Sequence, residues 1–145
     1  MKKTLMLIFL CACAMAGTAQ PREIALKFVE SFLNEKVSTD VIVATLLNVT
    51  TTDKDKIMLI KWHLEEARKE LRSKKVKLEN VRIVSYGEIP EHERSIVTDQ
   101  DQKEIGNIYF VYYTDKEFIP LLIRSDKVLA FATLDKGGRK YLMEY

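Results

Sequence analysis

The sequence predicts an α+β fold in which three N-terminal helices pack on one face of an antiparallel sheet of four to five strands. From residue 21 to about residue 75, apolar residues recur at three- and four-residue spacing, which is typical of amphipathic helices. From residue 76 the spacing changes to two and short polar turns separate the apolar runs, which is typical of antiparallel strands. No segment has the composition of an interdomain linker, so we expect one domain over residues 20–145.

Two helices are expected in the first part of that domain. Pro21 suits the first turn of a helix, and the apolar face that follows it continues for about four turns. The pattern then breaks before Ser38 or Thr39, either of which can cap a shorter helix over residues 40–47. The β-branched residues of this segment leave a strand open as the alternative.

The third helix is the longest, and its two halves differ. Thr52 and Asp55 have the spacing of a capping box at its start. One apolar stripe then continues for about five turns through Ile57, Ile60, Leu64, Ala67 and Leu71. Met58, Leu59 and Trp62 lie off that stripe, so the first half of the helix is apolar almost all round, whereas the second half is charged on its other faces. We therefore expect the first half to be covered on two sides and the second half on one.

The strands are predicted from alternation and from their β-branched and aromatic content. They cover residues 76–89, with an irregularity near Asn80, and then residues 108–113, 118–124, 128–134 and 141–145, with turns at 125–127 and 135–138. Pro120 should lie at a sheet edge or a bulge. Because the strands between residues 108 and 134 are apolar on both alternating faces, the sheet should either curl round its own core or have its outer face covered by another subunit.

The first nineteen residues have the pattern of a bacterial signal peptide. Two lysines precede an apolar run that is too short for a membrane span of about 20 residues. Small residues then predict cleavage between Ala19 and Gln20, which makes the protein exported, either periplasmic or secreted. A second interpretation takes residues 10–13 as a lipobox, with Cys13 lipidated and the protein anchored to the cell envelope.

Removal of residues 1–19 changes the composition in ways that exclude several classes of protein. The whole chain has a formal net charge of +2 and two cysteines, both in this segment, so residues 20–145 have balanced charge and no cysteine. We therefore exclude disulfide scaffolds, thiol enzymes and cysteine-ligated zinc modules. A nucleic-acid partner is not expected for a neutral exported chain. Residues 20–145 also hold no apolar run long enough for a transmembrane segment.

The order and size of the predicted elements resemble the NTF2-like superfamily, a cystatin-like α+β cone in which a strongly curved sheet wraps a few N-terminal helices. The opening segment, PREIALKFVESFLNEK, leading to a second helix, is similar to that of small exported bacterial proteins of unknown function in this superfamily. The resemblance covers residues 20–145 and implies a roll-shaped sheet, which in many members also mediates homodimerisation. The chain lacks the Gln-x-Val-x-Gly loop of cystatin inhibitors. Members range from enzymes to non-catalytic scaffolds, so the fold alone implies no activity.

Few residues have the spacing of a chemical site. His63 flanks the apolar stripe of the third helix and is expected to be structural, and His92 lies in a charged segment without a second histidine at metal-binding spacing. Asp53–Asp55 and Asp99–Asp101 resemble the start of a calcium loop but lack its later Gly and Glu. We therefore expect no catalytic residue, no metal and no cofactor.

The aromatic residues supply the candidates for a ligand pocket, with a filled core as the alternative. These candidates are Trp62, Phe110, Tyr112 and Phe131. The resemblance to isomerase-like and cyclase-like members implies a different site, a carboxylate base and a Tyr or Asp oxyanion donor inside the cone. The residues available for it are Tyr109, Tyr112, Tyr113, Asp135 and Asp40. A buried acid facing a tyrosine would favour such an enzyme.

These observations lead to one expected function and two alternatives. We expect a non-catalytic NTF2-like domain of the bacterial cell envelope that binds a ligand or an envelope protein and forms a homodimer through its sheet. The alternatives are a cone-pocket enzyme acting on a small molecule and a lipid-anchored structural protein.

Overall fold

The computed structural model describes residues 20–94 and 104–145, and within them the chain forms an α+β fold. The three helices are α1 (Pro21–Leu33), α2 (Thr39–Thr45) and α3 (Lys54–Ser73). The strands are β1 (Arg82–Ser85), β2 (Ile108–Tyr112), β3 (Phe118–Arg124), β4 (Lys127–Ala130), β5 (Ala132–Lys136) and β6 (Arg139–Met143). The predicted signal peptide, with Cys13 and Ala19, and the segment Asp99–Asp101 lie outside the described residues.

Two of the predicted helix starts are confirmed and one is wrong. Pro21 occupies the first turn of α1, and the Ser38 hydroxyl accepts a hydrogen bond from the amide of Val41, so Ser38 caps α2. At the start of α3 the cap is Asp53 instead of Thr52, because the Asp53 carboxylate accepts from the backbone N–H of Asp55 at 3.0 Å. A carboxylate in this position also suits the positive end of the helix dipole.

The C-terminus of α3 turns the chain toward the sheet without a glycine. The amide of Val76 donates to the carbonyl of Leu71 at 3.0 Å, and the amide of Lys75 donates to the carbonyl of Arg72 at 2.9 Å, the two bonds of a Schellman motif. Lys75 takes the left-handed conformation that this motif requires, with φ of 52°.

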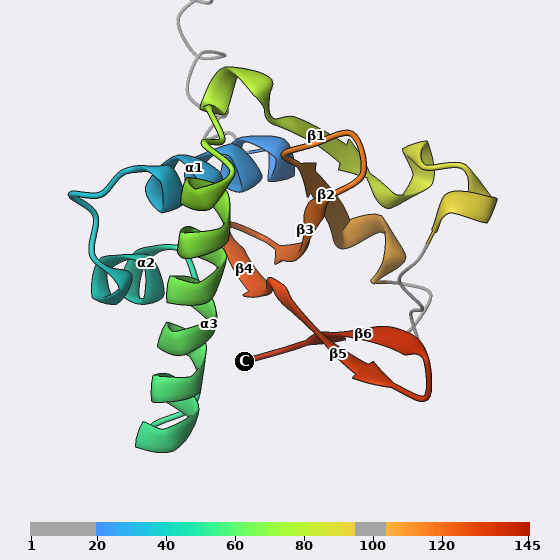
Figure 1. The fold of residues 1–145 in the computed structure, drawn as a ribbon. Coiled ribbons are helices and arrows are strands. Elements are labelled where there is room, and N and C mark those ends of the chain that lie inside the picture. Colours follow the sequence, from blue (N-terminus) through green and yellow to red (C-terminus); the bar gives the residue numbers. More distant parts are fainter. Residues whose placement is uncertain (1–19, 95–103) are drawn as a thin grey trace, which may run out of the picture.

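The sheets differ from the single sheet of four to five strands that the sequence predicts. One antiparallel sheet has the order β1-β2-β3-β4, and β5 pairs with β6 in a separate hairpin. Figure 1 shows the three helices on one side of the four-stranded sheet and the β5–β6 hairpin diverging from it. Of the predicted strand over 76–89 only β1 is a strand, because short 3-10 turns occupy Leu78–Asn80 and Tyr86–Glu88.

The predicted position of Pro120 at a sheet edge is confirmed. The amide of Tyr113 donates to the carbonyl of Glu117 at 3.1 Å and closes the β2–β3 hairpin. Counting along the alternating antiparallel ladder places Pro120 at a non-hydrogen-bonded position opposite Phe110, so β2 loses no bond to the missing N–H. On the other side β4 pairs with β3 only from Leu122 onward, so no described strand pairs with the first half of β3 there.

The predicted continuous strand over 128–134 is wrong, because it breaks at Phe131 between β4 and β5, and β4 also contains a bulge. Leu122 pairs with Ala130 and Ile123 pairs with Val128, which leaves Leu129 as an extra residue on β4. The carbonyl of Leu129 accepts the backbone amide of Tyr145 at 3.2 Å. Ala130 still pairs with β3, and the chain leaves the sheet at Phe131 before β5 begins.

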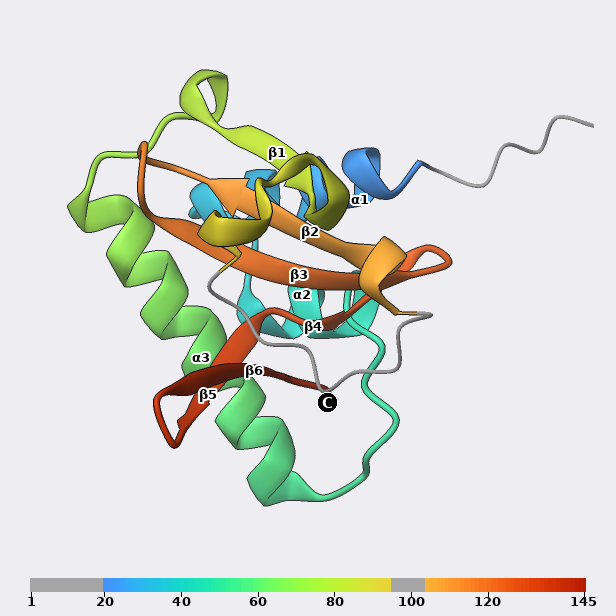
Figure 2. The same cartoon turned by 90° about the vertical axis from the view of Figure 1, so that its right-hand side faces the viewer.

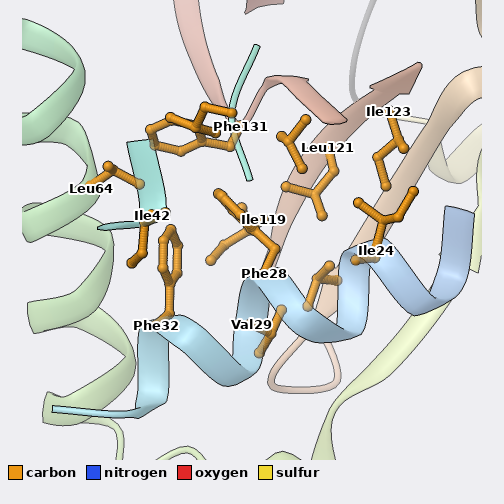
Figure 3. Close-up of a cluster of buried hydrophobic side chains, with 14 of the residues drawn as sticks. Ile24, Phe28, Val29, Phe32, Ile42, Leu64, Ile119, Leu121, Ile123 and Phe131 are labelled. Carbon is orange, nitrogen blue, oxygen red and sulfur yellow. The ribbon is translucent and has the colours of Figure 1, made fainter. Parts of the chain in front are cut away.

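The main core lies between the helices and the inner face of the sheet (Figure 3). The ring centroid of Phe28 lies 4.4 Å from that of Phe32 and 5.6 Å from that of Phe131, while Leu64 of α3 and Ile119 of β3 close the same cluster. Each such fully buried side chain contributes about 1.5–3 kcal/mol relative to an exposed one. The three aromatic rings thus hold α1 against the point where the sheet ends.

A second apolar cluster covers the outer face of the sheet, which confirms that the central strands are apolar on both faces. Its buried members come from β1 to β4 and from the segment after β1: Val84, Ile89, Ile108, Phe110, Leu122, Leu129 and Ala130. Figure 2 shows residues 86–94 crossing in front of β2, on the face opposite the helices. Tyr86 from this segment stacks on Phe110, with ring centroids 6.1 Å apart. The chain itself therefore covers much of this face.

The first half of α3 is covered on one side only among the described residues, contrary to the prediction from sequence. Met58, Leu59 and Trp62 are 64%, 50% and 55% exposed. Ile60 and Leu64, on the opposite side of the helix, are fully buried. The apolar residues off the predicted stripe therefore face solvent in the described chain.

Arg68 is the one charged residue of the described chain that is buried, at 4% exposure. It extends from α3 to the loop between α1 and α2, where its guanidinium donates to the carbonyl of Asn34 at 2.8 Å and to that of Val37 at 2.7 Å. Hydrogen bonds from a charged donor are stronger than neutral ones. Arg68 thus satisfies two loop carbonyls that follow the end of α1.

We expect Arg68→Met to destabilise the fold by about 2–4 kcal/mol, because the two loop carbonyls would lose their donors while the side chain keeps its length. The measurement is the free energy of unfolding from urea titration. Arg72→Met is the matched control, because Arg72 lies one turn further along α3, is 41% exposed and only approaches Glu35 at 3.8 Å. It should cost about 0.5 kcal/mol or less. Equal losses in the two variants would contradict this role of Arg68.

Glu88 joins the turn after β1 to helix α1. Its carboxylate accepts from the hydroxyl and the amide of Ser85, each at 2.7 Å, and from the guanidinium of Arg22 at 2.6 Å. The Ser85 hydroxyl, then the Ser85 amide and then Arg22 lower the pKa of Glu88 to about 2.

The lowered pKa makes the contribution of the Glu88 carboxylate to stability pH-dependent. It should be complete above the unfolded-state pKa of about 4.3 and should disappear as the pH falls toward 2, because the folded state then gains the proton that the unfolded state already carries. We expect the difference in unfolding free energy between wild type and Glu88→Gln to be constant above about pH 5 and to shrink between about pH 4.3 and 2. A difference that stays constant down to pH 2 would contradict it.

Candidate functional site

The candidate site is a groove of about 560 Å³ between the second half of α3, the beginning of β3 and the beginning of β5. It opens where β4 stops pairing with β3 and the chain turns away into β5. The residues that line it are His63, Glu66, Ala67, Lys69, Glu70, Ser73, Tyr113, Phe118, Ile119, Pro120, Phe131, Ala132 and Thr133. The break at Phe131 in the predicted strand over residues 128–134 thus lies at the groove.

The apolar side of the groove is part of the core. Phe131 is buried and packs on Phe28 of α1, and its ring centroid lies 5.0 Å from that of Tyr145. Ile119 belongs to the same cluster (Figure 3). Because these side chains are held from behind by close packing, the floor of the groove has a defined shape.

The polar wall of the groove comes from one side of α3. Glu66 and Glu70 are one helical turn apart, so their side chains are neighbours. One oxygen of Glu66 accepts from Lys69 at 2.6 Å, and Oε1 of Glu70 accepts from the Tyr113 hydroxyl at 2.6 Å and from Lys74 at 3.3 Å. Within the part of the chain that the structure describes, Oε2 of each carboxylate has no hydrogen-bond partner.

Tyr113 lines the groove beside Glu70. Burial, and then the carboxylate of Glu70 that accepts its hydrogen bond, raise the pKa of the Tyr113 phenol well above its ordinary value. The phenol therefore remains a donor at neutral pH. Lys74 lies 5.3 Å from the centroid of the Tyr113 ring and also pairs with Glu117, so both partners of Glu70 are themselves held in place.

His63 lies in the wall nearest the exposed part of α3. Its ring centroid is 4.9 Å from that of Trp62, in an edge-on arrangement. Burial lowers the pKa of His63 below its ordinary value, so the imidazole is neutral at pH 7. A neutral imidazole offers the groove one donor and one acceptor.

The structure does not bring the four predicted pocket residues together. Phe131 lines the groove, whereas Trp62 is exposed on α3. Phe110 and Tyr112 lie on the outer face of the sheet, where each packs against Phe118 with ring centroids 5.0 and 5.2 Å apart. Phe110 is therefore part of a packed apolar cluster, which is the alternative to a ligand pocket that the sequence left open.

The residues considered for an enzyme are also spread out. Asp40 pairs with Lys61 at the surface, and Asp135 is exposed on the hairpin. Tyr113 does face an acid, but that acid is Glu70, which the sequence pattern indicated only as part of a charged helix face. The side chain of Glu70 is 51% exposed, unlike the desolvated acid of a cone-pocket enzyme.

The charged segment around His92 forms no metal site among the described residues. His92 is exposed and approaches Glu93 at 3.6 Å, while Glu88 is bound to Ser85 and Arg22. No group of three His, Cys, Asp or Glu residues in the ranges 20–94 and 104–145 is placed to hold a metal ion. Over the same ranges, no helix has the length and apolar character needed to cross a membrane.

The comparisons with known proteins match nothing: no protein-family model, no curated protein and no solved structure is similar to this chain. The geometry of the groove is therefore the basis for any functional argument.

The Tyr113–Glu70 pair makes a prediction about titration at high pH. Because the neutral phenol is favoured in the fold, the contribution of Tyr113 to stability is complete below about pH 10 and is lost as the pH rises through its raised pKa. We expect tyrosinate absorbance to show Tyr113 ionising at lower pH in Glu70→Gln than in wild type. Tyr145 is the internal control, because burial alone raises its pKa, so its step should not move. An unchanged Tyr113 step would contradict the pairing.

Proposed function

We propose that the protein is a non-catalytic binding module of the bacterial cell envelope that holds its ligand in the groove between α3, β3 and β5. The groove itself carries the proposal. Its volume of about 560 Å³ falls within the range of about 300–1,000 Å³ that is usual for ligand sites. It also combines an apolar floor with a few polar groups on one wall, the arrangement that gives such sites both affinity and orientation.

The supports of the groove also favour binding. Phe131 and Ile119 are held by the core, and Tyr113 is held by Glu70. A site built on packed helices and strands loses little conformational freedom when it binds, so more of the contact energy appears as affinity.

A cone-pocket enzyme remains the second candidate, and one observation favours it. The Tyr113 hydroxyl donates to Glu70 at 2.6 Å, so a phenol and a carboxylate share one end of the groove. The carboxylate is half exposed and also accepts from Lys74. This environment suits a residue that positions Tyr113 better than it suits a desolvated base.

We also propose the NTF2-like roll and a homodimer. Three helices followed by antiparallel strands, with the helices on one face, agree with the element order of the roll. For a homodimer through the sheet, segment 86–94 already covers much of the outer face, which leaves less apolar area there for a second copy. Export with cleavage after Ala19, or a lipid anchor at Cys13, rests on the sequence pattern alone.

The test of the binding proposal fills the groove. Thr133→Trp puts a large side chain into it, and Asp135→Trp is the matched control, two residues further on the same face of β5 and outside the groove. A panel of small molecules and peptides is screened by thermal shift on wild type. Any ligand found should bind Thr133→Trp at least tenfold more weakly by calorimetry and should bind Asp135→Trp with an affinity close to that of wild type. Equal binding by the two variants would place the site elsewhere.

A further inference from the structure

We propose that the occupant of the groove is an extended peptide segment that carries a lysine or arginine. This rests on the proposed function and names its ligand class. The segment pairs with the free edge of β5, rests its apolar side chains on Phe131 and Ile119, and presents its basic side chain to Glu66 and Glu70. Three features of the groove lead to this choice, namely an unpaired strand edge, an apolar floor and an acidic wall.

The unpaired strand edge belongs to β5, which has β6 as its one partner among the described strands. Gly137 and Gly138 have φ of 61° and 76°, the positive values of a two-residue turn that closes on a hydrogen-bonded pair. Counting back from that pair along the ladder places Thr133 opposite Leu142 at a non-hydrogen-bonded position. The N–H and C=O of Thr133 therefore point away from β6, and Thr133 lines the groove.

The opposite edge of the groove is less suited to pairing. Among the described strands, none pairs with the first half of β3 on the β4 side, but Pro120 has no N–H to donate there. A peptide strand in the groove would thus form its backbone hydrogen bonds with β5, while β3 contributes the apolar side chain of Ile119. Strand addition to a free edge with side-chain pockets alongside is a common mode of peptide recognition.

Charge selects the side chains of the peptide. Two carboxylates line the groove, and each keeps one lysine partner, Lys69 for Glu66 and Lys74 for Glu70. Of these two lysines, Lys69 alone lines the groove, and its side chain is 69% exposed. Oε2 of Glu66 and Oε2 of Glu70 lack partners among the described residues and lie one turn apart. A guanidinium or ammonium can donate hydrogen bonds to both oxygens, and charge-assisted bonds of this kind are strong and geometrically specific.

Other occupants satisfy fewer of these groups. A cationic amphiphile matches the apolar floor and the carboxylates but leaves the N–H and C=O of Thr133 unpaired. An acidic peptide pairs with the strand edge but places like charges against Glu66 and Glu70. A basic extended peptide meets all three requirements.

The experiment tests four probes on the purified protein, three fluorescein-labelled peptides and one unlabelled competitor. The first is a nonapeptide of alternating Val and Lys, which places the two residue types on opposite faces of a strand. The second has Glu in place of Lys, the third is the Val–Lys peptide N-methylated at alternate amides, and the fourth is dodecyltrimethylammonium as a competitor without a peptide backbone. Binding is measured by fluorescence anisotropy.

We expect the Val–Lys peptide to bind, and to bind at least tenfold more weakly to Glu66→Gln/Glu70→Gln than to wild type. Glu23→Gln/Glu30→Gln is the matched control, because it removes the same charge from α1, away from the groove, and should leave the affinity within about twofold. N-methylation and the change from Lys to Glu should each reduce binding at least tenfold.

Equal binding of the N-methylated or the Val–Glu peptide, or equal effects of the two double variants, would overturn the proposal. Displacement of the Val–Lys peptide by the amphiphile with no effect of N-methylation would assign the groove to cationic amphiphiles instead. If no peptide binds, but a ligand from the thermal-shift screen binds more weakly to Thr133→Trp than to wild type, the peptide proposal fails and the proposed binding function remains. If Thr133→Trp weakens the binding of no ligand, both the peptide proposal and the proposed binding function of the groove fail.

Discussion

The central strands of the sheet bury apolar side chains on both faces, so this short chain has to cover one sheet twice. The helices cover the inner face, and the segment after β1 covers much of the outer face. The chain leaves this sheet at Phe131, β5 and β6 form a separate hairpin, and the groove lies at the point of divergence. The candidate site is thus a result of how the two-faced sheet is covered.

Polar interactions hold the covering elements in place. Arg68 joins α3 to the loop after α1, and Glu88 joins the segment after β1 to the start of α1. Tyr113 and Glu70 make the equivalent connection between the end of β2 and α3. Each of these links connects residues more than thirty positions apart, so they specify the arrangement of elements that apolar packing alone leaves less defined.

Local patterns in the sequence predicted local structure well. Ser38 as a helix cap, Pro120 at a free edge and the two-faced central strands are confirmed, because each depends on a few neighbouring residues. The bulge at Leu129 and the exposure of Trp62 were not predicted, because they depend on which segments cover the sheet and α3. Likewise, Glu66 and Glu70 look like an ordinary solvated helix face until the fold places β2 and β5 beside them. Of the predicted pocket residues, Phe131 alone lines the groove.

The exposed position of Trp62 has a practical consequence. It is the single tryptophan of the chain, it lies half in solvent, and it contacts His63, which lines the groove. Its emission is therefore free of background from other indoles and originates next to the site. The protein thus contains its own optical reporter, through which occupancy of the groove and movement of α3 can be followed without an added dye.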